Sequence, residues 1–294
     1  MPLLIGCDFS SRPGKKKPIV IARGERRGEV VQLQGLERLE SLEAFGLWLK
    51  QPGDWVGGFD FPFGLPRELV VNLGWPTTWE ACIRHYAGLS RREIRDQFSA
   101  FCNARPAGAK FAHRATDGPA HSSPSMKWVN PPVAYMLHAG VPPLIDAGVF
   151  LPGLHPGAGS DVDGQGHARR VALEAYPGWL AREVLGSKSY KSDTRSKQTP
   201  ERLSRREQLL HALESGTVRL GLSLQLTRSQ REVLHDDASG DSLDAVLCLL
   251  LAAWGSRHGW PWYGLPETMD PLEGWIVGAP PVAASTPGFR PPLE

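Results

Sequence analysis

Residues 240–254 read GDSLDAVLCLLLAAW, an apolar segment that starts with two acids, Asp241 and Asp244. The apolar run predicts a helix over about 241–256 that packs in the protein core. Its two acids have two interpretations. They can cap the helix and complement its macrodipole, or they can face a metal ion together, because side chains three residues apart lie on one face of a helix. The choice depends on whether other acids reach the same place.

Two further aspartates lie at the ends of predicted strands. Asp8 is in LLIGCDF at 3–9 and Asp60 is in WVGGFDF at 55–61, and both segments have the pattern of buried strands. Each aspartate alone is also typical of a turn. Open α/β sheets, however, place their sites at the carboxyl ends of strands, and a buried carboxylate needs a partner. Together with the two helix acids, these residues predict a site for Mg²⁺ or Mn²⁺, which prefer oxygen ligands.

Strands that alternate with helices along the chain predict an α/β fold. We expect further strands at 18–22, 29–33 and 170–175, a candidate strand at 273–278, and helices at 39–50, 67–73, 79–86, 91–102, 178–184 and 200–214. The first three strands are expected to form an antiparallel meander. We interpret residues 1–294 as one domain, with 67–165 as a mainly helical and loop insertion after the fourth strand and 279–294 as a Pro-rich C-terminal arm.

The composition excludes several classes of protein. With 41% hydrophobic and 22% charged residues, the 294-residue chain can bury a sizeable core and is not expected to be disordered. No two of the four cysteines form a CxxC pair, which is typical of a reducing compartment. The apolar runs are too short for a signal peptide or a membrane span. We therefore expect a cytoplasmic protein with no membrane partner, and the net charge of +2 permits a nucleic-acid partner through local basic patches.

Several stretches of the chain resemble the family catalogued as domain of unknown function 429, whose members are predicted nucleases with a ribonuclease H-like fold. The matching stretches are IGCDFSSRPGKKKPIVIA at 5–22, GGFDFPFGLP at 57–66, RVALEAYPG at 170–178, SYKSD at 189–193, GDSLDAV at 240–246 and PLEGWIVG at 271–278. The resemblance implies a ribonuclease H-like mixed sheet flanked by helices. It also implies that Asp8 bridges two metal ions, that Asp60 is the fourth-strand acid, and that Asp241 and Asp244 form the helix pair.

One departure from that pattern concerns the fourth strand. Many ribonuclease H-like enzymes carry a glutamate there, and the shorter side chain of Asp60 reaches less far. This leaves room for Glu174, in ALEAYP near the end of another predicted strand, to take part in the site. The alternative is that Glu174 is a salt-bridged structural carboxylate.

Residues that could contact a substrate fall in three places. Ser10 and Ser11 follow Asp8 and could bind phosphate, although they are also ordinary turn residues. The insertion carries a set of cationic side chains, and these are Arg105, Lys110, His113, Arg114 and Lys127. Lys191 lies in a basic segment with Tyr190, which could stack on a base, and a second basic cluster lies at 202–206. Solvated surface or loop anchoring is the alternative role for all of these.

The predicted function is hydrolysis of phosphodiester bonds in a nucleic acid by a metal-dependent nuclease. Two ions can bracket an in-line displacement at phosphorus, and Asp8, Asp60, Asp241 and Asp244, with Glu174 as a further candidate, are expected to hold them. One alternative is a phosphotransferase or phosphohydrolase that acts on a nucleotide or a small phosphorylated metabolite. Another is a non-catalytic nucleic-acid-binding module with the same fold.

Overall fold

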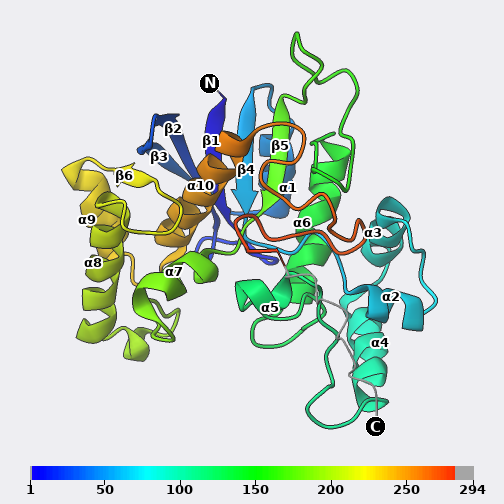
Figure 1. Ribbon diagram of the computed structural model, residues 1–294. Coiled ribbons are helices and arrows are strands. Elements are labelled where there is room, and N and C mark those ends of the chain that lie inside the picture. Colours follow the sequence, from blue (N-terminus) through cyan, green and yellow to red (C-terminus); the bar gives the residue numbers. More distant parts are fainter. Residues whose placement is uncertain (1, 282–294) are drawn as a thin grey trace, which may run out of the picture.

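A six-stranded sheet forms the centre of the computed structural model, which describes residues 2–281 (Figure 1). The strands are β1 (Leu3–Asp8), β2 (Ile19–Arg27), β3 (Val30–Leu39), β4 (Trp55–Phe59), β5 (Arg170–Glu174) and β6 (Ser223–Gln225), and their order across the sheet is β5-β4-β1-β2-β3-β6. The first three strands form the predicted antiparallel meander, while β4 runs parallel to β1 and β5 parallel to β4. The protein is therefore an α/β protein with a mixed sheet, as the sequence predicts.

Helices cover both faces of this sheet. They are α1 (Leu42–Leu49), α2 (Arg67–Asn72), α3 (Trp79–Ala87), α4 (Arg91–Asn103), α5 (Asp117–Ala120), α6 (Val133–Asp146), α7 (Pro177–Leu185), α8 (Pro200–Glu214), α9 (Arg228–Asp236) and α10 (Asp241–His258), with a short 3₁₀ turn at Arg195–Lys197. Figure 1 shows α10 lying across the sheet, with α8 and α9 at one side of the molecule and α2, α3 and α4 at the other. The helices α2 to α6 all come between β4 and β5 in the chain.

The alternation of side chains along the strands builds one apolar core on each face of the sheet. Leu4 of β1 packs in the core that includes α7, α8 and α10. Its neighbour Ile5 packs in the opposite core with Phe45 of α1 and with apolar residues of α3, α4 and α6. Helices α2, α3, α4 and α6, which lie between β4 and β5 in the chain, thus cover the face of the sheet opposite α10.

Two glycines let α10 lie directly on the sheet. A Cβ atom at Gly6 of β1 would come within 1.9 Å of the Ala245 carbonyl oxygen, and one at Gly58 of β4 within 2.5 Å of the Cys248 carbonyl oxygen. All residues from Asp241 to Ala253 are buried, so the helix is enclosed on all its sides. This close contact fixes the first turn of α10 beside the carboxyl ends of β1 and β4.

Some predicted boundaries are wrong. Strand β3 continues to Leu39, so the helix predicted at 39–50 starts only at Leu42, where Ser41 caps it through a 3.0 Å hydrogen bond from the Ala44 amide. The candidate strand at 273–278 contributes only a single bridge between Ile276 and Glu174. Helix α6 lies in a segment with no predicted helix, and it keeps its helical form around two internal prolines. Of the predicted Pro-rich arm at 279–294, residues 282–294 lie outside the described part of the chain.

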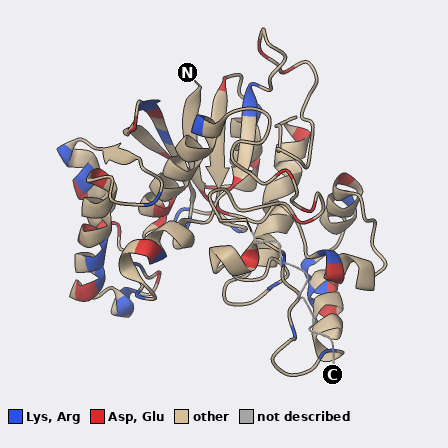
Figure 2. Cartoon of the chain, in the orientation of Figure 1, with Lys and Arg blue, Asp and Glu red and all other residues tan. Residues whose placement is uncertain are grey.

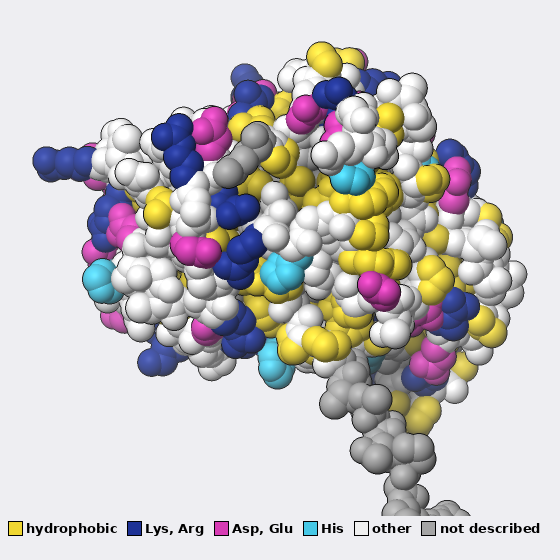
Figure 3. All heavy atoms as spheres, turned by 45° about the horizontal axis from the view of Figure 1, so that its top comes forward, with side chains coloured by type: hydrophobic (Ala, Val, Ile, Leu, Met, Phe, Trp, Pro, Cys, Tyr) yellow, Lys and Arg dark blue, Asp and Glu magenta, His cyan; other side chains and the backbone are white. Residues whose placement is uncertain are grey.

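Charged residues of both signs gather on the outlying helices α4 and α8 (Figure 2). Figure 3 shows one face of the molecule, on which a short row of Lys and Arg side chains borders a broad band of hydrophobic ones. Within residues 2–281, no single helix is long and apolar enough to cross a membrane, although α9 and α10 meet that criterion together, by length and composition, across a bend of 119°.

Candidate metal centre

Three of the four predicted aspartates meet at one edge of the sheet. Asp8 ends β1, Asp60 follows β4, and Asp244 lies in the first turn of α10, and each offers a carboxylate oxygen within 4.8 Å of the other two. The backbone amide of Asp60 donates to the Cys7 carbonyl oxygen at 2.9 Å, which continues the pairing of β4 with β1 beyond the strand end. The parallel strands and the close packing of α10 therefore place these three side chains together.

Asp8 and Asp60 lack protein partners for their carboxylates. Among residues 2–281, neither carboxylate accepts a hydrogen bond from a backbone or side-chain donor, although Asp8 is only 7% exposed. Burial raises the pKa of Asp8 well above its ordinary value, the charges of Asp241 and Asp60 add to this, and the Lys191 charge opposes it. Burial likewise raises the pKa of Asp60 to about 6. Carboxylates held together in a poorly solvated place without donors are unfavourable when charged, and a divalent cation between Asp8, Asp60 and Asp244 would relieve this cost.

The third carboxylate, Asp244, already has two partners. It is fully buried and accepts hydrogen bonds from the Tyr190 hydroxyl and from the Lys191 ammonium group. Burial raises the pKa of Tyr190, which keeps its hydroxyl protonated and able to donate. The suggestion that Tyr190 stacks on a base is therefore wrong, because its ring is buried and its hydroxyl is bound to Asp244.

Asp241 lies beside the cluster and contacts a different cation. Its Oδ1 atom is 2.6 Å from the Lys17 Nζ atom, which also lies 2.9 Å from Asp193. Burial lowers the pKa of Lys17, but the hydrogen bonds to Asp241 and Asp193 raise it by more, so the ammonium group stays charged. The negative charge of Asp241 helps to raise the pKa of Asp8, but Asp241 is not one of the three acids whose oxygens converge.

A third aspartate, Asp237, has the capping role that the sequence would also allow for Asp241 and Asp244. Its carboxylate accepts hydrogen bonds from the amides of Ser239, Gly240 and Ser242, at 3.2, 3.2 and 2.9 Å. Gly240 occupies the N-cap position in the left-handed conformation, with φ +77°. Because Asp237 satisfies these amides at the start of the helix, Asp241 and Asp244 are left to face the site.

The segment that carries Lys191 is held by the helix that follows it. Arg205 and Arg206 of α8 donate to the carbonyl oxygens of Ser189 and Tyr190 at 2.9 and 2.8 Å, and Arg202 donates to that of Lys191. The basic cluster at 202–206 thus anchors this segment through its backbone. This cluster therefore has a structural role in holding the Lys191 segment.

Glu174 belongs to a second group of charges, next to the first. Arg114, which is 3% exposed, donates to both Glu174 oxygens at 2.7 and 2.8 Å, and the Phe63 amide donates to Glu174 at 2.8 Å. Asp117 accepts from the Arg114 backbone and guanidinium groups and from the Ser122 hydroxyl. Burial lowers the pKa of Arg114, but the two carboxylates raise it by more, so the guanidinium stays charged. Arg114 is therefore occupied and not free to bind phosphate, and Glu174 is a salt-bridged carboxylate that lies outside the converging three.

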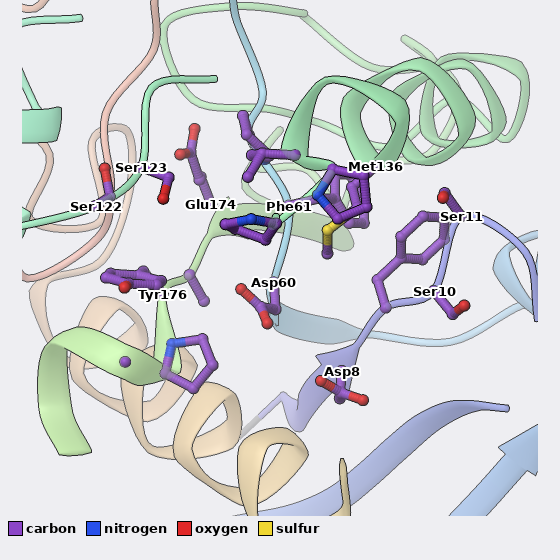
Figure 4. Close-up of a pocket in the computed structure, with 18 of the residues that line it drawn as sticks. Asp8, Ser10, Ser11, Asp60, Phe61, Ser122, Ser123, Met136, Glu174 and Tyr176 are labelled. Atoms are coloured by element: carbon purple, nitrogen blue, oxygen red, sulfur yellow. The ribbon is translucent and has the colours of Figure 1, made fainter. Parts of the chain in front are cut away.

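A cavity of about 570 Å³ opens beside the acid cluster, and of the four predicted aspartates Asp8 and Asp60 line it. Of the predicted site residues other than the aspartates, it is lined by Ser10, Ser11, Arg114, Glu174 and Lys191, whereas Arg105, Lys110, His113 and Lys127 do not line it. Arg105 pairs with Glu68, and Lys110 and His113 are exposed. Figure 4 shows Asp8 and Asp60 at one end of the cavity, with the Glu174 carboxylate pointing away from them.

Sequence reasoning missed Lys17 and Asp237 as residues that build the site, and it gave Tyr190 a different role, stacking on a base. Lys17 stands out only as the last of three lysines, and nothing in that run distinguishes it from the other two. Asp237, three residues before Gly240, carries a usable signal, because an aspartate before a glycine turn commonly accepts from the amides that follow.

Comparisons with protein-family models, with curated proteins and with solved structures find no match for this chain. The resemblance to domain of unknown function 429 stays a prediction.

Proposed function

We propose that this protein is a metal-dependent hydrolase of phosphodiester bonds in a nucleic acid. The observation that carries the proposal is the pair Asp8 and Asp60, whose carboxylates line the cavity, accept no hydrogen bond from residues 2–281 and offer oxygens within 4.8 Å of an Asp244 oxygen. Structural carboxylates are normally satisfied by the protein. An arrangement that gathers them without donors is costly unless a cation is bound there, and perturbed acids in a cavity are typical of functional sites.

The donor set fits Mg²⁺ or Mn²⁺, because all three groups offer carboxylate oxygen and no nitrogen or sulfur. Asp8, Asp60 and Asp244 would hold one ion, and a second would require Asp241 to part from Lys17. A bound divalent ion supplies positive charge beside a phosphoryl oxygen and lowers the pKa of a water molecule that attacks phosphorus. The carboxylates hold the charge and do not act as nucleophiles.

Two lysines of the chain are placed where they can bind the substrate phosphate. Lys17 and Lys191 both line the cavity, and each reaches one of the helix acids. In that position their ammonium groups can bind the non-bridging oxygens of a phosphate that enters the cavity. Ser10 and Ser11 add hydroxyl groups on the same side, directly after Asp8.

The strand order supports the ribonuclease H-like assignment. An antiparallel meander followed by two parallel strands places the first-strand acid next to the fourth-strand acid, as the resemblance implies. The additional strand β6 pairs with β3 at the far edge and does not disturb this arrangement.

A cleavage assay tests the proposal. We expect the wild-type protein to cut labelled DNA or RNA in the presence of Mn²⁺, and Asp8→Asn to lower the rate by roughly a hundredfold or more. Asp146→Asn, at an exposed acid outside the cavity, is the matched control and should leave the rate unchanged. Absence of Mn²⁺ binding in calorimetry, or cleavage that Asp8→Asn does not affect, would refute the proposal.

The size of the cavity favours one second candidate, a phosphohydrolase that acts on a free nucleotide. Its volume of about 570 Å³ lies within the range of small-molecule sites. Release of inorganic phosphate from mononucleotides, without cleavage of any polynucleotide, would identify this activity instead.

A further inference from the structure

The cavity has two sides with different chemistry. Asp8, Asp60, Lys17 and Lys191 form one side. The other carries the Arg114–Glu174 ion pair and two serines, Ser122 and Ser123, together with an apolar surface lined by Phe61, Pro132, Val133, Met136 and Tyr176. In Figure 4 Tyr176 and Met136 lie on either side of Asp60. A ligand that fills the cavity therefore needs an anionic part for the first side and a flat, mainly apolar part for the second.

Tyr176 is the aromatic side chain best placed to receive such a group. It is half-buried at the start of α7, and within residues 2–281 its hydroxyl has no hydrogen-bond partner. A Cβ atom at Gly178 would come within 2.7 Å of its ring, so the ring lies closely against the backbone of the helix. Among the described residues, the Ser123 hydroxyl on the same cavity also has no partner. The ring is thus held in place, and two polar groups remain free to bind a ligand.

The depth of the acids limits what can reach them. Asp244 is fully buried and Asp8 is 7% exposed, so a phosphate must enter the cavity to approach them. A base that lies against the apolar side of this cavity, while its phosphate lies at the acids, has left the stack and the pairing of a continuous duplex. An unpaired nucleotide fits, because its base can leave the stack and follow the phosphate.

We propose that the apolar side of the cavity, centred on Tyr176 and Met136, binds the base of one unpaired nucleotide whose phosphate lies at the acid cluster. This inference rests on the proposed function and adds the class of substrate: a single-stranded segment or a free nucleotide, and not a continuous duplex. The ring of Tyr176 stacks on the base, while the Ser123 hydroxyl contacts the polar edge of the base or its sugar.

Binding measurements with defined strands test this inference. We would measure fluorescence anisotropy of a labelled ten-nucleotide single strand, the same strand with abasic sugars, and the same sequence as a duplex, each with Ca²⁺. The wild-type protein should bind the intact strand roughly 5- to 150-fold more tightly than the abasic strand, the range that one stacked base contributes. Tyr176→Ala should reduce this ratio to near one, and Tyr176→Phe should retain it. Asp146→Ala, on α6 but outside the cavity, is the matched control.

The outcomes separate this inference from the function on which it rests. Calorimetry with Mn²⁺ should give equal metal affinity for wild type and Tyr176→Ala, and absence of metal binding in both would refute the proposed function. Metal binding combined with equal affinity for intact and abasic strands, or for strand and duplex, would overturn the inference alone. Adenosine 5′-monophosphate as competitor distinguishes the two sources: displacement of the strand at comparable concentration identifies a free nucleotide, and its absence identifies a polynucleotide segment.

Discussion

Two groups of carboxylates lie side by side at the edge of the sheet, and they differ in how the protein treats them. Glu174 and Asp117 share the fully enclosed guanidinium of Arg114 and accept further hydrogen bonds from Phe63 and Ser122. Asp8 and Asp60 accept none from the residues described, and their side chains line the cavity. Position in the fold therefore does not separate the acids whose hydrogen bonds the protein supplies from Asp8 and Asp60, whereas the number of hydrogen-bond donors does.

The closed group, which consists of Glu174 and Asp117 around Arg114, is expected to show the largest change in stability on substitution. Arg114→Met leaves two buried carboxylates without their cation, and breaking a buried ion pair in this way costs about 3–5 kcal/mol of the free energy of unfolding. Urea denaturation measures this loss. The matched control is Arg84→Met, which removes an exposed i,i+4 pair with Glu80 and should change stability by no more than about 0.5 kcal/mol. A similar small change for Arg114→Met would show that the group is not a structural anchor.

The open group, which consists of the three converging acids Asp8, Asp60 and Asp244, should respond in the opposite direction. The pKa of Asp60 is raised to about 6 by burial, above its ordinary value of 3.8. Without metal, its ionisation therefore lowers the stability of the folded state as pH rises from about 4 to 6, and the full penalty remains above pH 6. We expect Asp60→Asn to raise the free energy of unfolding by about 1–2 kcal/mol at pH 7.5 and to leave it unchanged at pH 4.

Urea denaturation in EDTA at these two pH values measures this gain. Asp117→Asn is the matched control in the closed group and should lower stability by about 1–3 kcal/mol at pH 7.5, because it weakens satisfied hydrogen bonds. If both asparagine variants destabilise the protein alike, the distinction between the two groups is wrong.

The contrast also explains how far the sequence could predict this site. Asp8 and Asp60 end short apolar runs, and two acids open the apolar helix, so local pattern alone places them at the carboxyl edge of the sheet. The pairing of Arg114 with Glu174 joins residues 60 positions apart. No local sequence pattern at either residue indicates this ion pair, so the sequence predicts both as candidate site residues.

The close contacts between α10 and the sheet could not be predicted from the sequence either. Gly6 and Gly58 read as ordinary members of buried strands, and only the position of α10 shows that their missing side chains bring Asp244 to Asp8. The same holds for the arginines at 202–206. Their spacing is that of an exposed basic helix face, and only the fold shows that they bind the backbone of the Lys191 segment.

The smallest expected effect concerns the cation that now contacts the open group. The Lys191 ammonium binds Asp244, so a divalent ion among Asp8, Asp60 and Asp244 must compete with it. Lys191→Gln removes that competitor. Because the Lys191 side chain is 37% exposed and can turn to solvent, we expect Mn²⁺ to bind only about fivefold more tightly, which corresponds to ~1 kcal/mol.

Calorimetric titration with Mn²⁺ measures this change, and Lys17→Gln is the matched control. Lys17 contacts Asp241, which is outside the three converging acids, so its substitution should change the affinity of that ion less than Lys191→Gln does. Weaker Mn²⁺ binding in Lys191→Gln would mean that the lysine shapes the open group and does not compete for it. In that case Asp244 would belong with the satisfied structural acids, and Asp8 and Asp60 would be the only open carboxylates of the three.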